Sequence, residues 1–161
     1  MKNLKRVLDK IDLEILAVMF ADPSLSNKDI AMKVKLAPSS SLERIKKLQS
    51  DGIIETLNMQ VNLQALGGHI QAMISVRLKD HNRATVDNFQ KSLLPMNEVL
   101  SVFHMGGEND FFVHVTVVDS IHLRDFVFNA ITARQEVNHV ETALVYDHQI
   151  SHTLPNVNHQ R

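Results

Sequence analysis

The sequence predicts an α+β protein with two parts: three helices first, then a four-stranded sheet with two helices. Apolar residues recur at helical spacing in the first part, whereas later segments alternate apolar and polar residues in the order β-α-β-β-α-β. The parts also differ in charge. Residues 1–53 carry ten Lys and Arg against seven Asp and Glu, and residues 54–161 carry seven against eleven. We therefore expect the first part to meet a polyanion and the second to do something else.

Composition excludes several classes of protein. The 161 residues include no cysteine, which rules out a disulfide scaffold, thiol catalysis and cysteine-ligated zinc. The longest apolar run, Ile15 to Ala21, is far too short to span a bilayer, and no signal-peptide pattern opens the chain. We expect a cytoplasmic protein with no membrane partner.

The first two helices have clear ends. Apolar residues from Leu8 to Met19 recur every three or four positions in "LDKIDLEILAVMFAD", and Pro23 ends this helix. Ser26 stands three residues before Asp29, a spacing that resembles a capping box. The second helix is therefore expected in "NKDIAMKV".

The third helix is expected to begin near Pro38, which a first helical turn tolerates, and to end at Gly52. Leu42, Ile45 and Leu48 mark its buried stripe. The opposite face then presents small hydroxyls at its start and cations further along.

Such a helix suits the major groove of DNA, because small hydroxyls approach bases closely while cations beside them hold phosphates. With the second helix crossing behind it, the pair forms a helix-turn-helix. The candidates for base edges are Ser39, Ser40, Glu43 and Lys47; the flanking candidates for phosphates are Arg44 and Lys46; Ser41 completes the set of DNA-binding candidates. The alternative is an ordinary solvated helix with surface lysines.

The pattern changes from Ile53 onward. "IIETLNMQVNL" reads as one strand and "QALGGH" as a glycine-marked break, so we expect domain boundaries at 1–53, 54–68 for a linker strand and hinge, and 69–161. The later strands are expected in "IQAMISVRL", "EVLSVFHM", "DFFVHVTVV" and "NHVETALVY", with helices in "RATVDNFQKSLL" and after a cap at Ser120. This order predicts a ferredoxin-like antiparallel sheet with both helices on one face. A partner is expected to cover the other face.

Four stretches are similar to one known family: "LDKIDLEIL", "LSNKDIAMKVKLAPSSSLERIKKLQSDGII", "NLQALG" and "GENDF". In this order and spacing, the chain resembles the Lrp/AsnC (leucine-responsive, feast/famine) transcription regulators over nearly its whole length. The resemblance implies a winged-helix-like helix-turn-helix domain that binds double-stranded DNA, and a ferredoxin-like domain. It also implies a homodimer that assembles further into an octamer, and regulation rather than catalysis.

The resemblance also implies an effector, typically an amino acid, near the turn between the second and third strands of the sheet. Carried over by position, the effector-binding candidates are Met105, Gly106, Gly107, Glu108 and Asp110, with Thr142 on the last strand. Glycine N–H groups suit an effector carboxylate and an acidic side chain suits its ammonium, while Met105 and Phe111 would sort its side chain. The alternative is a plain hairpin turn.

The chain departs from the family pattern before the third helix. Lys35 stands where the family often has Gly, so we expect a left-handed backbone there. Ala37 stands where a capping Ser is frequent, so we expect capping by Ser39 or Ser40, the latter with Glu43 as S-x-x-E.

The sequence gives less support to three other functions: a metal site, an enzyme and a binding module without DNA. His104 and His114 are expected on adjacent strands but no third ligand is evident, so no metal or other cofactor is predicted. Sirohaem-type tetrapyrrole decarboxylases look like the same two-domain architecture, yet the second half is acidic, Tyr146 is its single tyrosine and no catalytic motif is present. We expect no enzyme. An amino-acid-binding module without DNA binding would leave the basic helix idle.

Overall fold

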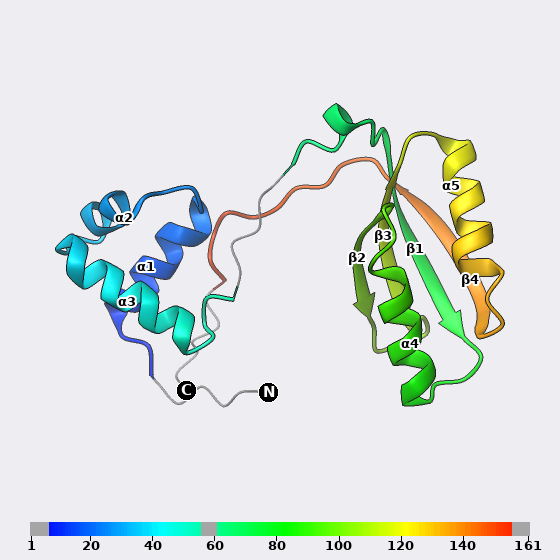
Figure 1. Cartoon of the computed structure of the whole chain (residues 1–161), viewed down its shortest axis with the longest axis horizontal. Helices are drawn as coiled ribbons and strands as arrows, with labels where there is room; N and C mark the ends of the chain where they lie inside the picture. Colours follow the sequence, from blue (N-terminus) through cyan, green and yellow to red (C-terminus); the bar gives the residue numbers. More distant parts are fainter. Residues whose placement is uncertain (1–6, 56–60, 156–161) are drawn as a thin grey trace. The chain divides into compact units, whose positions relative to one another are not determined.

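The computed structural model describes residues 7–55 and 61–155 (Figure 1). The chain divides into two compact units, Met1–Gln60 with Gln149–Arg161, and Val61–His148. Each unit has its own hydrophobic core. Among the described residues, no helix is long and apolar enough to cross a membrane.

Side chains that bind backbone N–H groups start the first two helices. Helix α1, Lys10–Ala21, follows the N-cap Asp9 and ends before Pro23. Helix α2, Asn27–Lys33, follows Ser26, whose hydroxyl accepts the N–H of Asp29 at 3.3 Å. The predicted start at Ser26 is confirmed, because this hydroxyl satisfies a donor that the helix itself leaves open.

Helix α3, Pro38–Ser50, begins without a side-chain cap. Its N-cap is Ala37, whose methyl group cannot accept a hydrogen bond, so the prediction of capping by Ser39 or Ser40 is wrong. Lys35 has φ 55°, the left-handed backbone that the sequence predicted at this position.

The three helices enclose a small core made of Ile15, Met19, Ile30, Val34, Ile45 and Leu48. Two of these are in α3. The predicted stripe of α3 is correct for Ile45 and Leu48 but wrong for Leu42, which is 41% exposed. Ser41 takes the inward position instead, because it lies four and seven residues before these two side chains on the same helical face.

The segment between the units differs from the predicted strand. Residues 53–55 and 61–63 do not form a strand, and residues 56–60 lie outside the described part of the chain. A short helical turn, η1 at Gln64–Leu66, precedes Gly67, which has φ 90°. At Gly68 an added Cβ would lie 2.4 Å from Oγ1 of Thr116, so this backbone packs too closely for any side chain.

The second unit is a four-stranded antiparallel sheet in the order β2-β3-β1-β4. Its strands are β1 Ile70–Leu78, β2 Val99–His104, β3 Phe111–Val117 and β4 Val137–Val145. Its helices are α4 Arg83–Leu93 and α5 Ser120–Phe126, the latter continuing as the π-helical turn η2 Val127–Thr132. The predicted ferredoxin-like βαββαβ fold is confirmed. The cap of α5 is Asp119, not Ser120, because the Asp119 carboxylate accepts the N–H of His122 at 2.8 Å.

Both helices lie on one face of the sheet (Figure 1). Alternate residues of β1 and β3 point into the core beneath them, including Ile74 and Val113, which are 0% exposed. The opposite face carries the intervening residues, among them Met73 and Phe112, both half-buried, and His114. Among the described residues, no helix covers this face.

Candidate functional sites

The outward face of α3 carries most of the predicted DNA-binding residues. The exposed ones are Ser39, Ser40, Glu43, Lys46 and Lys47. At about 100° per residue, Ser39, Glu43 and Lys46 lie opposite the buried stripe of the helix. Ser41 is wrong as a DNA contact, because its side chain is 0% exposed and faces the core.

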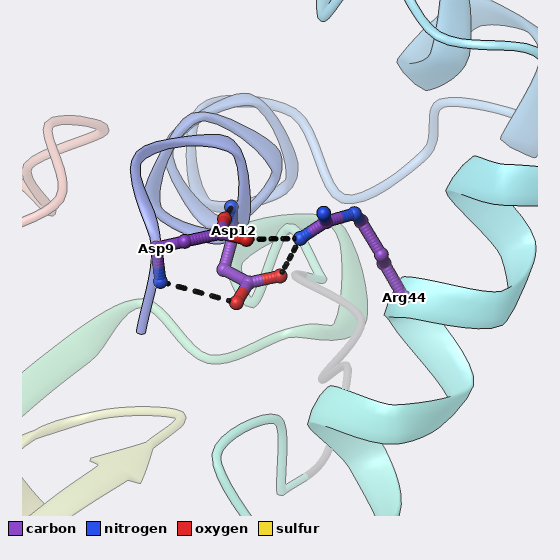
Figure 2. Close-up of polar contacts among 3 residues, drawn as sticks. All are labelled: Asp9, Asp12 and Arg44. Carbon is purple, nitrogen blue, oxygen red and sulfur yellow. Dashed lines mark hydrogen bonds and ion pairs between the residues drawn. The ribbon is translucent and has the colours of Figure 1, made fainter. Parts of the chain in front are cut away.

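Arg44 extends from α3 toward Asp9 and Asp12 at the start of α1 (Figure 2). Its NH1 group donates to Oδ2 of Asp9 at 2.7 Å and to Oδ1 of Asp12 at 2.8 Å. The Arg44 side chain is 29% exposed, whereas Asp12 is 0% exposed. The hydrogen bond from Arg44 is the main reason that the pKa of Asp9 lies below its ordinary value, with the N–H of Asp12 second. Sequence reasoning missed this cluster, because helical spacing does not show which helices touch.

The predicted effector turn joins β2 and β3. Its hairpin closes with a hydrogen bond from the N–H of Met105 to the carbonyl of Asp110, at 2.8 Å. Gly107 has φ 148°, a backbone that L side chains rarely adopt. A Cβ added to Gly106 or Gly107 would meet no atom within 4 Å, so the space beside both glycines is open.

Asp110 ties this turn to the sheet. Its Oδ2 accepts the N–H of Leu78 at 2.7 Å, and its Oδ1 lies 2.8 Å from Nδ1 of His81. The side chain is 13% exposed. Both carboxylate oxygens therefore have partners within the protein, which the sequence did not indicate. Glu108 is 81% exposed and forms an ion pair with Arg77.

Hollows open at the β2–β3 turn and beside α5. One, of about 480 Å³, lies at the effector turn and is lined by Arg77, Glu108, Asn109, Asn138, His139 and Glu141. Another, of about 390 Å³, is lined by Ser120, Leu123, Arg124, Val127, Phe128, Thr132 and Thr142. Thr142 pairs with the buried Ile74 and so lies on the helix-covered face. Within one chain, the structure does not bring Thr142 to the turn.

The two apolar neighbours of the turn differ. Phe111 is 0% exposed and packs on Phe89 with ring centroids 4.9 Å apart, so the prediction that it sorts an effector side chain is wrong. Met105 is 38% exposed and remains available.

The histidines do not form the cross-strand pair that spacing suggested. His114 lies opposite Ser101, and His104 lies opposite Phe111 and stacks on its ring. Burial, and secondly the nearby His148, lower the pKa of His114. In the described ranges, no three His, Cys, Asp or Glu side chains gather in a group that could hold a metal ion.

Comparison with known families fits both units. Residues 8–55 match the family model described as winged helix-turn-helix DNA-binding, and residues 71–155 match the Lrp/AsnC ligand binding domain. The chain belongs to the Lrp/AsnC family. It is a transcription regulator with a helix-turn-helix domain that binds DNA and a ligand-binding domain.

Several relatives carry the same arrangement along nearly the whole chain. The HTH-type transcriptional regulator AldR of Mycolicibacterium smegmatis is 33% identical over 143 residues, which are 89% of this chain and 84% of AldR. A transcriptional regulator of Neisseria meningitidis, solved in complex with L-Met, is 29% identical with a TM-score of 0.83, covering 92% of this chain and 97% of that one. An AsnC family regulator from Agrobacterium tumefaciens is 26% identical with a TM-score of 0.80, covering 92% and 97%.

Proposed function

We propose that this chain is a sequence-specific transcription regulator whose DNA binding or assembly responds to an amino acid bound at the turn between β2 and β3. The observation that carries the proposal is the polar hollow at this turn, lined by Glu108 and Asn109, on a helix-turn-helix protein. The regulator of Neisseria meningitidis in complex with L-Met supports an amino acid as the effector class.

DNA reading is assigned to the exposed face of α3. Ser39 and Glu43 lie opposite the buried stripe, so they face base edges when α3 enters the major groove. Lys46 and Lys47, both exposed, then hold phosphates on either side.

The salt dependence of DNA binding tests this assignment. Lys46→Ala is expected to weaken binding to every sequence and to reduce the slope of log affinity against log salt by about 1, since one phosphate contact releases one counterion. The matched control is Lys10→Ala on α1, whose side chain is 90% exposed. A slope that changes equally in both variants would contradict the assignment.

Effector binding is assigned to the glycine backbone and Glu108. The N–H groups of Gly106 and Gly107 would hold the carboxylate of a free amino acid. Glu108 is the better partner for its ammonium, because Glu108 is exposed and pairs with Arg77 through Oε1, so an ammonium can reach Oε2. Asp110 instead holds the turn in shape through Leu78 and His81.

Calorimetric titration with the twenty amino acids tests the effector site. Glu108→Ala is expected to lower affinity about tenfold to a hundredfold, the equivalent of one charge-assisted hydrogen bond, without changing thermal stability by more than a small amount. The comparison is Glu98→Ala, another glutamate of this unit, which pairs with His122 away from the turn. If the wild-type protein binds none of the amino acids, the turn is only a hairpin.

A symmetric homodimer is part of the proposal, with an octamer as the larger assembly. The sheet face without helices carries the half-buried apolar side chains Met73 and Phe112, which a second copy would bury. Light scattering at micromolar concentration is expected to give at least a dimer. A monomer would contradict this part of the proposal without affecting the DNA-binding assignment.

Regulation is proposed in preference to catalysis, because the relatives are named as transcriptional regulators. The hollow at the turn is lined by two glutamates and one arginine, a poor match for a tetrapyrrole with several carboxylates. A coloured tetrapyrrole that copurifies with the protein would favour the decarboxylase instead.

A further inference from the structure

We propose that Arg44 is a positioning residue for DNA reading: it fixes the rotation of α3 against the start of α1, and it does not itself bind a DNA phosphate. The cluster of Asp9, Asp12 and Arg44 is called here the α1–α3 clamp (Figure 2). The inference goes beyond the assignment of the exposed face, because the clamp residues lie behind that face.

In the α1–α3 clamp, each carboxylate uses one oxygen to cap α1 and the other oxygen to bind Arg44. One oxygen of Asp9 accepts the N–H of Asp12 at 2.8 Å, and one oxygen of Asp12 accepts the N–H of Asp9 at 3.3 Å. These two bonds form a capping box that starts α1. The other oxygen of each carboxylate accepts NH1 of Arg44. The capping box therefore holds both carboxylates in place before Arg44 binds them.

The contact from Arg44 matters for α3 because this helix buries few apolar side chains in the core. Its buried side chains are Ser41, Ile45 and Leu48, of which only two are apolar. Oγ of Ser41 has no hydrogen-bond partner among the described residues, so this position adds no directional contact. Nδ2 of Asn27 donates to the carbonyl of Pro38 at 2.8 Å and so holds the start of α3, whereas Arg44 lies near the middle of the helix. A bridge from Arg44 to fixed carboxylates supplies a directional contact there.

Rotation of α3 about its own axis matters because it moves the side chains that face the bases. Ser39, Glu43 and Lys46 lie on the outward side of α3, and Arg44 directly follows Glu43 in the sequence. A base contact requires placement within a fraction of an ångström, so a helix that rocks about its axis loses contacts to bases before it loses contacts to phosphates. Loss of the clamp should therefore reduce specificity more than total DNA binding.

The two possible roles of Arg44 predict opposite results for its acidic partners. If Arg44 binds phosphate, Asp12 and Asp9 compete with DNA, and neutralising either one frees the cation and strengthens binding. If Arg44 positions α3, neutralising either carboxylate weakens specific binding. Asp12 is 0% exposed and cannot contact DNA directly, so a change in affinity on its replacement does not come from a lost contact to DNA.

The experiment measures DNA binding of the full-length protein over a range of salt concentrations. The DNAs are a duplex that the wild-type protein selects from a random-sequence pool, and a shuffled duplex of the same length. The variants are Asp12→Asn, Asp9→Asn and Arg44→Ala. Glu14→Gln is the matched control, because it removes the same charge from α1 at a half-exposed position that pairs only weakly with Lys10, at 3.9 Å.

We expect Asp12→Asn and Arg44→Ala to weaken binding to the selected duplex about tenfold, the equivalent of one hydrogen bond to a charged group, with binding to the shuffled duplex nearly unchanged. The salt slope should stay at the wild-type value in both. Asp9→Asn, whose side chain is 50% exposed in the wild type, should give a smaller loss in the same direction. Glu14→Gln should leave the ratio between the two duplexes unchanged.

Three results would overturn the proposal. One is tighter binding by Asp9→Asn or Asp12→Asn than by Glu14→Gln. Another is a salt slope that falls by about 1 in Arg44→Ala, which would make Arg44 a phosphate contact. The third is an equal loss on both duplexes at a temperature where thermal melting shows the variant folded, which would leave the clamp with a general structural role. If Asp12→Asn does not fold, Asp9→Asn and Arg44→Ala decide by the same criteria.

Discussion

Asp12 and Asp110 share one pattern of contacts but meet different side chains. Each carboxylate gives one oxygen to a backbone N–H, of Asp9 or of Leu78, and the other oxygen to a side chain. For Asp12 that side chain is Arg44, which stays charged at any pH at which the protein is folded. For Asp110 it is His81, which is 64% exposed and charged only when protonated.

The difference shows two ways of holding an element to which we assign a function: each is tied down by a carboxylate, one fully buried and one partly exposed. The carboxylate of Asp12 on α1 is fully buried and meets the permanent cation of Arg44 on α3, so this contact is expected to persist under all folding conditions. The carboxylate of Asp110 is partly accessible and its partner His81 is exposed, so this contact is easier to open. A rigidly held helix suits the base contacts that we propose for α3. A turn that opens more easily suits the small effector that we propose for the β2–β3 turn.

Arg44→Ala should give the largest effect on stability. Arg44→Ala removes two hydrogen bonds to carboxylates, one of them to the fully buried Asp12, so it is expected to lower the free energy of unfolding by about 2 to 3 kcal/mol. Urea denaturation followed by circular dichroism measures it. The control is Arg124→Ala, which breaks an exposed pair with Asp125 and should cost less than about 1 kcal/mol. Equal losses in the two variants would mean that burial of Asp12 gives the clamp no special strength.

Asp110→Ala should have the next largest effect. It removes the acceptor of the Leu78 N–H at a partly buried position, so the expected loss is about 2 kcal/mol without any effector present. His81→Ala keeps that acceptor and removes only the exposed contact, so it should cost less than about 1 kcal/mol. If His81→Ala is as damaging as Asp110→Ala, the histidine and not the backbone N–H holds the turn.

The pH dependence of the α1–α3 clamp should be small and confined to acid. Arg44 lowers the pKa of Asp9 in the folded protein below the ordinary value of 3.8. The unfolded chain therefore binds a proton at higher pH than the folded one, so this contribution is complete above about pH 4 and is lost as pH falls below it.

Asp9→Asn removes this contribution. The difference in urea midpoint between the wild type and Asp9→Asn should be constant near neutral pH and should shrink below about pH 4. The lowered pKa of Asp22 affects both proteins equally and cancels in the difference. A difference that stays constant down to pH 3 would show that Asp9 has its ordinary pKa in the fold.

Apart from the linker strand, the sequence by itself determined the described helices and strands and their order. Ser26, Pro38 and Gly52 mark helix ends through local geometry, and the alternation in "IQAMISVRL" specifies β1 to the residue. These signals act between residues a few positions apart, so the chain carries them without any tertiary contact. The left-handed backbone at Lys35 was predicted in another way, from the family resemblance, because Gly is frequent at this position in the family.

Only the tertiary structure decided which side chains face which neighbours. The predicted and observed orientations of α3 differ by part of a turn, so Ser41 and not Leu42 lies in the core. The orientation depends on how α1 and α2 pack against α3. The contacts of Arg44 with Asp12 and of Asp110 with Leu78 join residues 32 positions apart. Helical and strand periodicity say which face a residue occupies but not what it meets there, because that depends on the packing of elements that are distant in the chain.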